Sequence, residues 1–136
     1  FLSEVKFTHK NNCSLWFAEK ALGHIQHDLL GSMIIEKWGV SPIIEKVARW
    51  HHTYSKGSRF LVDDPKIHKL IDIVMLANHM IKELRFGNSG SAEIEDLPSA
   101  SLRRRRMNEE EYISAREAVR MQIDAESENL AILLKE

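Results

Sequence analysis

The chain has 136 residues, 43% of them hydrophobic and 29% charged, and its nineteen basic residues nearly balance twenty acidic ones. This length suits one globular domain over residues 1–136 and leaves no room for a second full domain. The net charge of -1 provides no overall attraction to nucleic acid or to an anionic membrane. The single cysteine, Cys13, excludes an internal disulfide and a cysteine-based zinc knuckle.

No apolar run approaches the roughly 20 residues that are needed to span a bilayer. The first residues, FLSEVKFTHKNN, lack the apolar stretch of a signal peptide. With a lone cysteine, which suits a reducing compartment, these features favour a cytoplasmic protein without membrane contact. Because the chain begins with Phe1 instead of methionine, a processed chain or a fragment of a longer protein is one interpretation.

Hydrophobic spacing predicts helices almost throughout and no strand of convincing length, and therefore an all-α bundle of about five helices. A short first helix is expected after the capping residues Asn12 and Ser14, with its end near Leu22 and Gly23. A second helix over residues 24–38 carries His27 on its apolar face. The other members of that face are Leu30, Gly31, Ile34 and Trp38.

A third helix is expected to begin at Ser41 and Pro42, an N-cap followed by proline at the first helical position, and to run toward His51 and His52. Its predicted inner face consists of Ile44, Val47, Ala48 and His51.

A long fourth helix should follow Asp64 and Pro65. In its helical phase Asp72 groups with His68 and His79, so we expect all three to face solvent instead of binding a ligand. The predicted apolar stripe consists of Ile67, Leu70, Ile71, Val74, Ala77, Ile81 and Leu84.

Residues 87–107 are rich in Gly, Ser and charge and predict a partly mobile surface connection. Four consecutive arginines, Arg103 to Arg106, lie in it; we interpret them as solvated or paired within the chain, and we expect no nucleic-acid binding. A final helix is predicted over residues 108–136, with Glu111 placed for a capping box with Asn108.

The segment from Gly23 to His52 combines His27-x-x-x-Gly31, a helix that ends in Trp38, a helix that begins at Pro42, and the pair His51-His52. In this order and spacing it resembles the C-terminal half of an HDOD domain. The similarity is best over residues 23–87. It implies an HD-domain-like fold related to the HD and HD-GYP phosphohydrolases, and a bacterial-type role in signal transduction.

The resemblance implies a comparison with the catalytic relatives, which hold divalent metal ions. Their ligands are an upstream His-Asp pair, the histidine of His-x-x-x-Gly, the His-His pair and a later aspartate. Here nothing before residue 23 resembles the upstream pair. Thr53 replaces the glutamate that follows the His-His pair in HD-GYP proteins, and Asn78 stands near the position of an aspartate. The resemblance therefore implies no cofactor, although a divalent metal is the alternative.

Four of the seven histidines lie in the second and third predicted helices. The candidate metal ligands are His27, His51, His52 and Asp28, with His24 as a possible neighbour. The histidines offer nitrogen donors, which suit zinc, nickel or iron, and Asp28 offers a carboxylate. The competing interpretation is a vestigial site in which these histidines satisfy buried polar groups.

Three functions stay open at this point. The first is a non-catalytic regulatory module that acts through a protein partner or an adjacent signalling domain. The second is a metal-dependent phosphohydrolase or phosphodiesterase, with Asp28 as a ligand or general base. The third is a structural half-domain that a homo-oligomer would complete.

Overall fold

The computed structural model describes the backbone of residues 1–87 and 89–133 and the side chains within these ranges up to residue 126. Over this part of the chain every regular element is a helix, which confirms the all-α prediction. The described residues form seven α-helices and one 3-10 helix, more than the five helices expected. They are α1 (Leu2–Asn11), α2 (Leu15–Ala21), α3 (His27–Lys37), α4 (Pro42–Trp50), η1 (Lys56–Ser58), α5 (Pro65–Glu83), α6 (Ser99–Arg105) and α7 (Glu109–Leu133).

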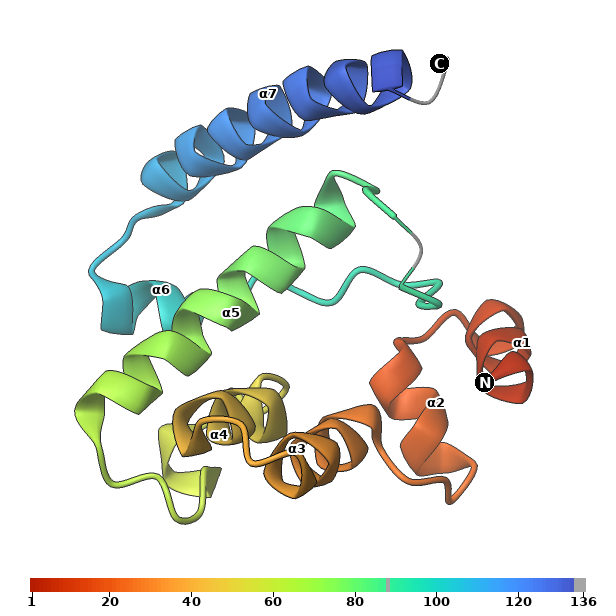
Figure 1. Cartoon of the computed structure of the whole chain (residues 1–136), viewed down its shortest axis with the longest axis vertical. Helices are drawn as coiled ribbons and strands as arrows, with labels where there is room; N and C mark the ends of the chain where they lie inside the picture. The colour runs from red at the N-terminus through yellow and green to blue at the C-terminus, as the bar shows by residue number, and fades with distance from the viewer. Residues whose placement is uncertain (88, 134–136) are drawn as a thin grey trace.

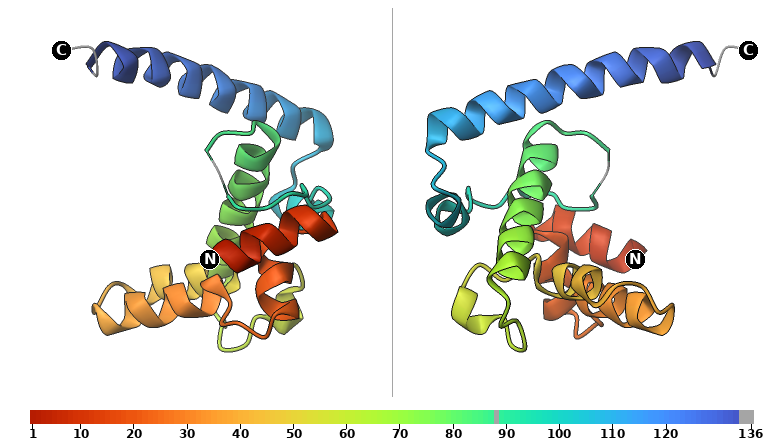
Figure 2. Two further views of the ribbon diagram at one scale, coloured as in Figure 1. Left: turned by 90° about the vertical axis from the view of Figure 1, so that its right-hand side faces the viewer. Right: turned by 60° about the vertical axis from the view of Figure 1, so that its left-hand side comes forward.

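Helix α5 runs through the middle of the molecule, and α4 and α6 pack against it (Figure 1). Helix α3 pairs with α4, and α1 pairs with α2. Helix α7 lies across the C-terminal end of α5 and extends away from the other helices (Figure 2). No helix in the described residues is long and apolar enough to cross a membrane.

Most of the buried apolar side chains in the described residues form two clusters along α5. One lies at its N-terminal half and the other between its C-terminal half, α6 and α7. The first contains Val62, Ile67, Ile71 and Met75, and the second contains Leu76, Met80, Leu102 and Tyr112.

Four of the five predicted helix starts are confirmed at the level of single hydrogen bonds, whereas the helix predicted from residue 24 begins at His27. Ser14, Ser41 and Asp64 each accept a hydrogen bond from a backbone amide in the first turn of α2, α4 and α5. Asn108 and Glu111 form a reciprocal capping box at the start of α7, with both hydrogen bonds at 2.8 Å. The last three residues of the predicted helix over 108–136 lie outside the described part of the chain.

The prediction of which side of α5 faces solvent is wrong. Asp72 has no exposed surface, and His68 and His79 are also buried, whereas Leu70 and Val74 from the predicted apolar stripe are exposed. The reason is that polar partners from the segment after η1, from α6 and from α7 cover this side of α5. Hydrophobic spacing alone cannot anticipate such partners, because they come from distant parts of the chain.

The carboxylate of Asp72 joins three parts of the fold. It accepts hydrogen bonds from Arg59 Nη2 at 2.7 Å, from Arg104 Nη2 and Nε at 2.7 and 2.8 Å, and from the Ser101 hydroxyl at 3.2 Å. Arg59 is itself almost completely buried. The arginine run is therefore partly paired within the chain, as expected, through Arg104 and, at 3.9 Å, Arg105.

The expected surface connection over residues 87–107 contains helix α6, so this prediction is wrong for residues 99–105. The connection is also fastened to the N-terminal helices. The Thr8 hydroxyl donates to Gly90 O at 2.8 Å, and Leu15 N donates to Ser91 Oγ at 3.0 Å. Gly90 has a φ of 72°, and a Cβ at this position would lie 3.2 Å from Val5 Cγ2, so only glycine fits without strain.

Replacing Asp72 with alanine should lower the free energy of unfolding by about 3–5 kcal/mol, because it leaves a buried guanidinium without its counter-charge. Urea denaturation of the purified chain measures this difference. The matched control is Asp63→Ala at an exposed position, which should stay within about 0.5 kcal/mol of the wild type. Equal effects of the two substitutions would contradict the structural role of Asp72.

Candidate functional site

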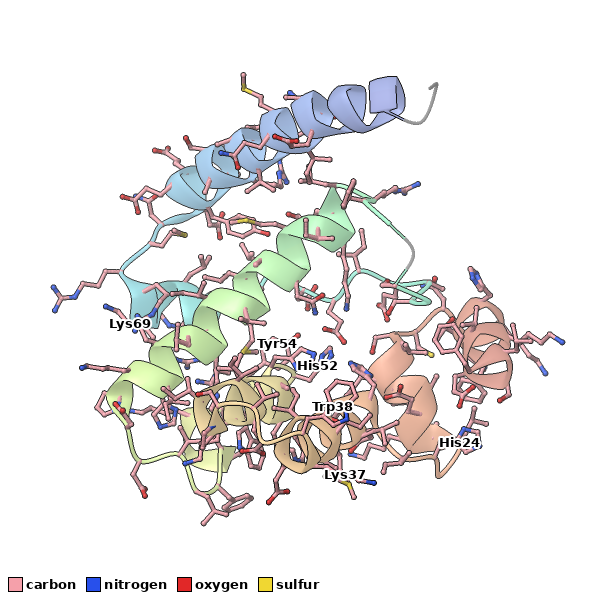
Figure 3. The ribbon with its side chains drawn as sticks, in the orientation of Figure 1. His24, Lys37, Trp38, His52, Tyr54 and Lys69 are labelled. Carbon is pink, nitrogen blue, oxygen red and sulfur yellow. The ribbon has the colours of Figure 1, made fainter. Side chains whose placement is uncertain are left out.

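Three histidines predicted as metal ligands lie together where α3 begins and α4 ends. One ring nitrogen from each of His27, His51 and His52 lies within 4.8 Å of the other two. The shortest contact joins His27 Nε2 and His52 Nε2 at 2.9 Å. In Figure 3 the labelled His52 lies near the centre of the molecule, between α5 and the α3–α4 pair. The site is thus assembled at the open end of the α3–α4 hairpin.

Glu19 on α2 fixes the orientation of the first histidine. Its buried carboxylate accepts a hydrogen bond from His27 N at 3.0 Å and lies 2.8 Å from His27 Nδ1. The first contact satisfies a backbone amide at the start of α3 that has no partner within the helix. The second places a proton on Nδ1 and leaves the Nε2 lone pair of the neutral ring directed at His52.

A backbone carbonyl orients the second histidine. His51 Nδ1 lies 2.6 Å from Ala48 O, and since a carbonyl only accepts, Nδ1 carries the proton and Nε2 of the neutral ring has a free lone pair. Burial lowers the pKa of His51; the hydrogen bond to Ala48 works in the opposite direction, and the neighbouring His27 adds to the lowering.

The third histidine is strongly held in its neutral form. Burial, followed by the proximity of His51 and His27, lowers the pKa of His52 to about 2. Its ring stacks on Trp16 with centroids 6.1 Å apart and an angle of 25° between the planes. His52 therefore stays a neutral imidazole at neutral pH, in which one ring nitrogen carries a proton and the other has a lone pair.

The donor set fits a divalent ion that prefers nitrogen ligands, such as zinc. Such ions bind imidazole nitrogens at about 2.0–2.1 Å, and their histidine ligands typically donate the other ring N–H to a carboxylate or a backbone carbonyl. Glu19 and Ala48 O provide these outer contacts for His27 and His51. A cavity of about 290 Å³ adjoins the three rings and leaves space for a further ligand. Trp16, Asn78, Lys82 and Ser91 are among its lining residues.

The other two candidate residues point elsewhere. Asp28 is buried, and its carboxylate bonds to Arg49 Nη1 and to the amide of Leu29, both at 2.8 Å. His24 Nδ1 lies 2.7 Å from the carboxylate of Glu4, and Figure 3 shows His24 at the edge of the molecule. Neither joins the cluster of three histidines.

Sequence reasoning did not place Glu19, Lys82 or Trp16 at this site. Glu19 reaches its partner across the turn between two helices, so helical spacing carries no signal of the contact. The local hint in the sequence is a glutamate near the end of the short helix that precedes the helix of His27. Lys82 belongs to α5, and its position at the site depends on how α5 packs on α4.

A second candidate feature is the set of exposed apolar side chains on and beside α3 and α4, which we call the α3–α4 apolar surface. Helix α4 has no buried residue, and Trp38, which follows α3, is 75% exposed. The predicted inward orientation of Leu30, Ile34, Trp38 and Ile44 is therefore wrong in this structure. In Figure 2 the α3–α4 pair projects from one side of the molecule. The surface consists of Leu30, Met33, Ile34, Trp38, Ile43 and Ile44.

Comparison of the chain with protein-family models, with curated proteins and with solved structures finds no match.

Proposed function

We propose that this chain is a non-catalytic regulatory module that acts through contact with a protein partner or an adjacent domain. The observation that carries the proposal is the α3–α4 apolar surface. Six large apolar side chains on one helical pair lie open to solvent, and exposed apolar side chains concentrated in one part of a molecule are typical of sites of protein interaction. The resemblance to HDOD domains points to the same class of function.

The composition of the surface supports a protein partner over a small ligand. Tryptophan is enriched among the residues that dominate binding energy at protein interfaces, and Trp38 is the most exposed side chain of the surface. Methionine, here Met33, is also enriched in the cores of such interfaces. Charged residues flank the surface at Lys37 and Glu45, which agrees with a polar rim around an apolar centre.

Replacing Trp38 with serine should weaken partner binding at least about 30-fold, because an interface tryptophan contributes roughly 2 kcal/mol or more. The partner would be identified by a photocrosslinking residue at Ile43, with the same residue at the exposed Lys69 as a reference for nonspecific capture. Affinities of the purified partner for wild type and variants are then measured by titration calorimetry.

The matched control is Phe17→Ser, which removes an exposed aromatic side chain from α2, outside the α3–α4 apolar surface. It should leave the affinity unchanged. Equal losses for the two variants would refute binding at this surface. Sedimentation over a wide concentration range tests the alternative of a half-domain completed by a second copy, in which the wild type is dimeric and Trp38→Ser is monomeric.

The cluster of His27, His51 and His52 favours a second candidate function, metal-dependent hydrolysis of a phosphodiester or nucleotide. A divalent ion held by the three imidazoles would supply Lewis-acid activation of water at its open position. The chain's own contribution would be to orient His27 through Glu19 and to place Lys82 beside the adjoining cavity. The ammonium of Lys82 suits the negative charge of a phosphate group.

The metal hypothesis predicts one equivalent of zinc, manganese or iron in the purified chain and its loss in His27→Ala, since two nitrogen donors cannot replace three. Elemental analysis measures both. Glu19→Gln should weaken zinc binding by about 10–100-fold, because it removes the carboxylate that orients His27.

Two histidines provide matched controls for these substitutions. His9 is exposed on α1 and His24 pairs with Glu4, so His9→Ala and His24→Ala should keep the metal. The metal hypothesis is contradicted if the wild-type chain contains no metal after purification with zinc, manganese and iron supplied. The interaction module would then be the remaining candidate function.

A further inference from the structure

A second titratable cluster fastens α7 to the rest of the molecule, on the side of α5 that was expected to face solvent. His79 Nδ1 lies 2.7 Å from the hydroxyl oxygen of Tyr112, and His79 Nε2 lies 2.9 Å from Glu95 O. The hydroxyl of Tyr112 also lies 2.9 Å from Glu83 Oε2. Arg116 approaches the same carboxylate oxygen at 3.3 Å. We call His79, Tyr112 and Glu83 the α5–α7 cluster.

Counting protons shows that these contacts are not all hydrogen bonds when His79 is neutral and Glu83 is ionised. The Glu95 carbonyl only accepts, so Nε2 must carry the proton of the neutral ring and Nδ1 is bare. The one proton of the Tyr112 hydroxyl then serves either Nδ1 or the carboxylate. The remaining contact brings two lone pairs together at less than 3 Å.

One additional proton makes all three contacts hydrogen bonds, and it has two possible positions. With His79 doubly protonated, Nδ1 donates to the tyrosine oxygen and the tyrosine donates to Glu83. With Glu83 protonated instead, the carboxyl group donates to the tyrosine oxygen and the tyrosine donates to Nδ1. Both arrangements contain the same number of protons. The cluster therefore needs one additional proton, whether His79 or Glu83 holds it.

The neighbouring groups do not hold this additional proton, so its sites are His79 and Glu83. Burial, followed by the hydrogen bond and charge of Glu83, raises the pKa of Tyr112 well above its usual value, so the hydroxyl keeps its own proton. The Glu95 side chain is engaged by the Tyr54 hydroxyl at 2.8 Å. The remaining titratable groups facing His79 line a small cavity beside it, namely Tyr54, His51, His52 and Lys82; Arg116 on α7 compensates Glu83.

We propose that docking of α7 on α5 takes up one proton at the α5–α7 cluster, so that the C-terminal helix is held when this proton is bound and loosens as the pH rises. The inference is independent of what binds the α3–α4 apolar surface.

The direction of the effect follows from linkage. A proton bound by the docked state and not by the released state stabilises docking at low pH, and this contribution disappears as the pH rises. One linked proton changes the docking equilibrium by up to about tenfold per pH unit. Tyr112 belongs to the buried apolar cluster with Leu76, Met80 and Leu102, so weaker docking also loosens that cluster.

Hydrogen exchange of the α7 amides over residues 113–121 tests the proposal. Protection is expressed as the intrinsic rate divided by the observed rate at the same pH, which removes the intrinsic pH dependence of exchange. Between pH 6 and pH 8 the protection of the wild type should fall by at least about tenfold. Equal protection at the two values would overturn the proposal.

Glu83→Gln provides the sharper test, because its amide N–H mimics the protonated carboxyl group. The amide donates to the Tyr112 oxygen, and Tyr112 donates to neutral His79, so no additional proton is needed. This variant should keep the same protection at pH 6 and pH 8. The control Tyr54→Phe removes another tyrosine hydroxyl of this region and should retain the pH dependence of the wild type. A wild-type response in Glu83→Gln would refute the proton count.

Discussion

The ion pairs of Asp72 hold together three parts of the chain that are distant in sequence. Its carboxylate binds Arg59 from the segment after η1 and Arg104 from α6 while lying on α5 itself. Burial alone would raise the pKa of Asp72, but the hydrogen bonds from Arg104 and Arg59 outweigh it and keep the pKa below its usual value. The carboxylate is therefore charged at neutral pH. The pairing orders α5, on which α4 and both buried clusters depend.

The predictable parts of the fold are those that local chemistry determines. Ser41 with Pro42 and Asn108 with Glu111 contain in a few residues everything needed to start a helix, and the structure has helices there. Helix α6 was missed because it buries only Ser101 and Leu102 within a stretch of arginines and small residues. Asp72, His68 and His79 were placed on the wrong side because their partners lie far away in sequence.

The candidate site shows the same division between local and distant information. Periodicity places His27 on the second predicted helix and His51 and His52 at the end of the third, and the α3–α4 turn then brings the two ends together. Asp28 was chosen only because it follows His27 in sequence. Its role as the partner of Arg49 depends on the packing of α3 against α4. Glu19 supplies the carboxylate near the cluster instead, from a helix that spacing could not relate to α3.

The contact between His27 and His52 joins residues that are 25 positions apart in the chain. It lies where α3 begins and α4 ends, so it closes the whole hairpin into a ring. An ion shared by these imidazoles would act as a cross-link, restricting the unfolded chain in the way a disulfide does. For a ring of this size the loss of chain entropy corresponds to about 3–4 kcal/mol. This chain has one cysteine and cannot form an internal disulfide. The ion would give it a reversible cross-link in the hairpin that carries the α3–α4 apolar surface.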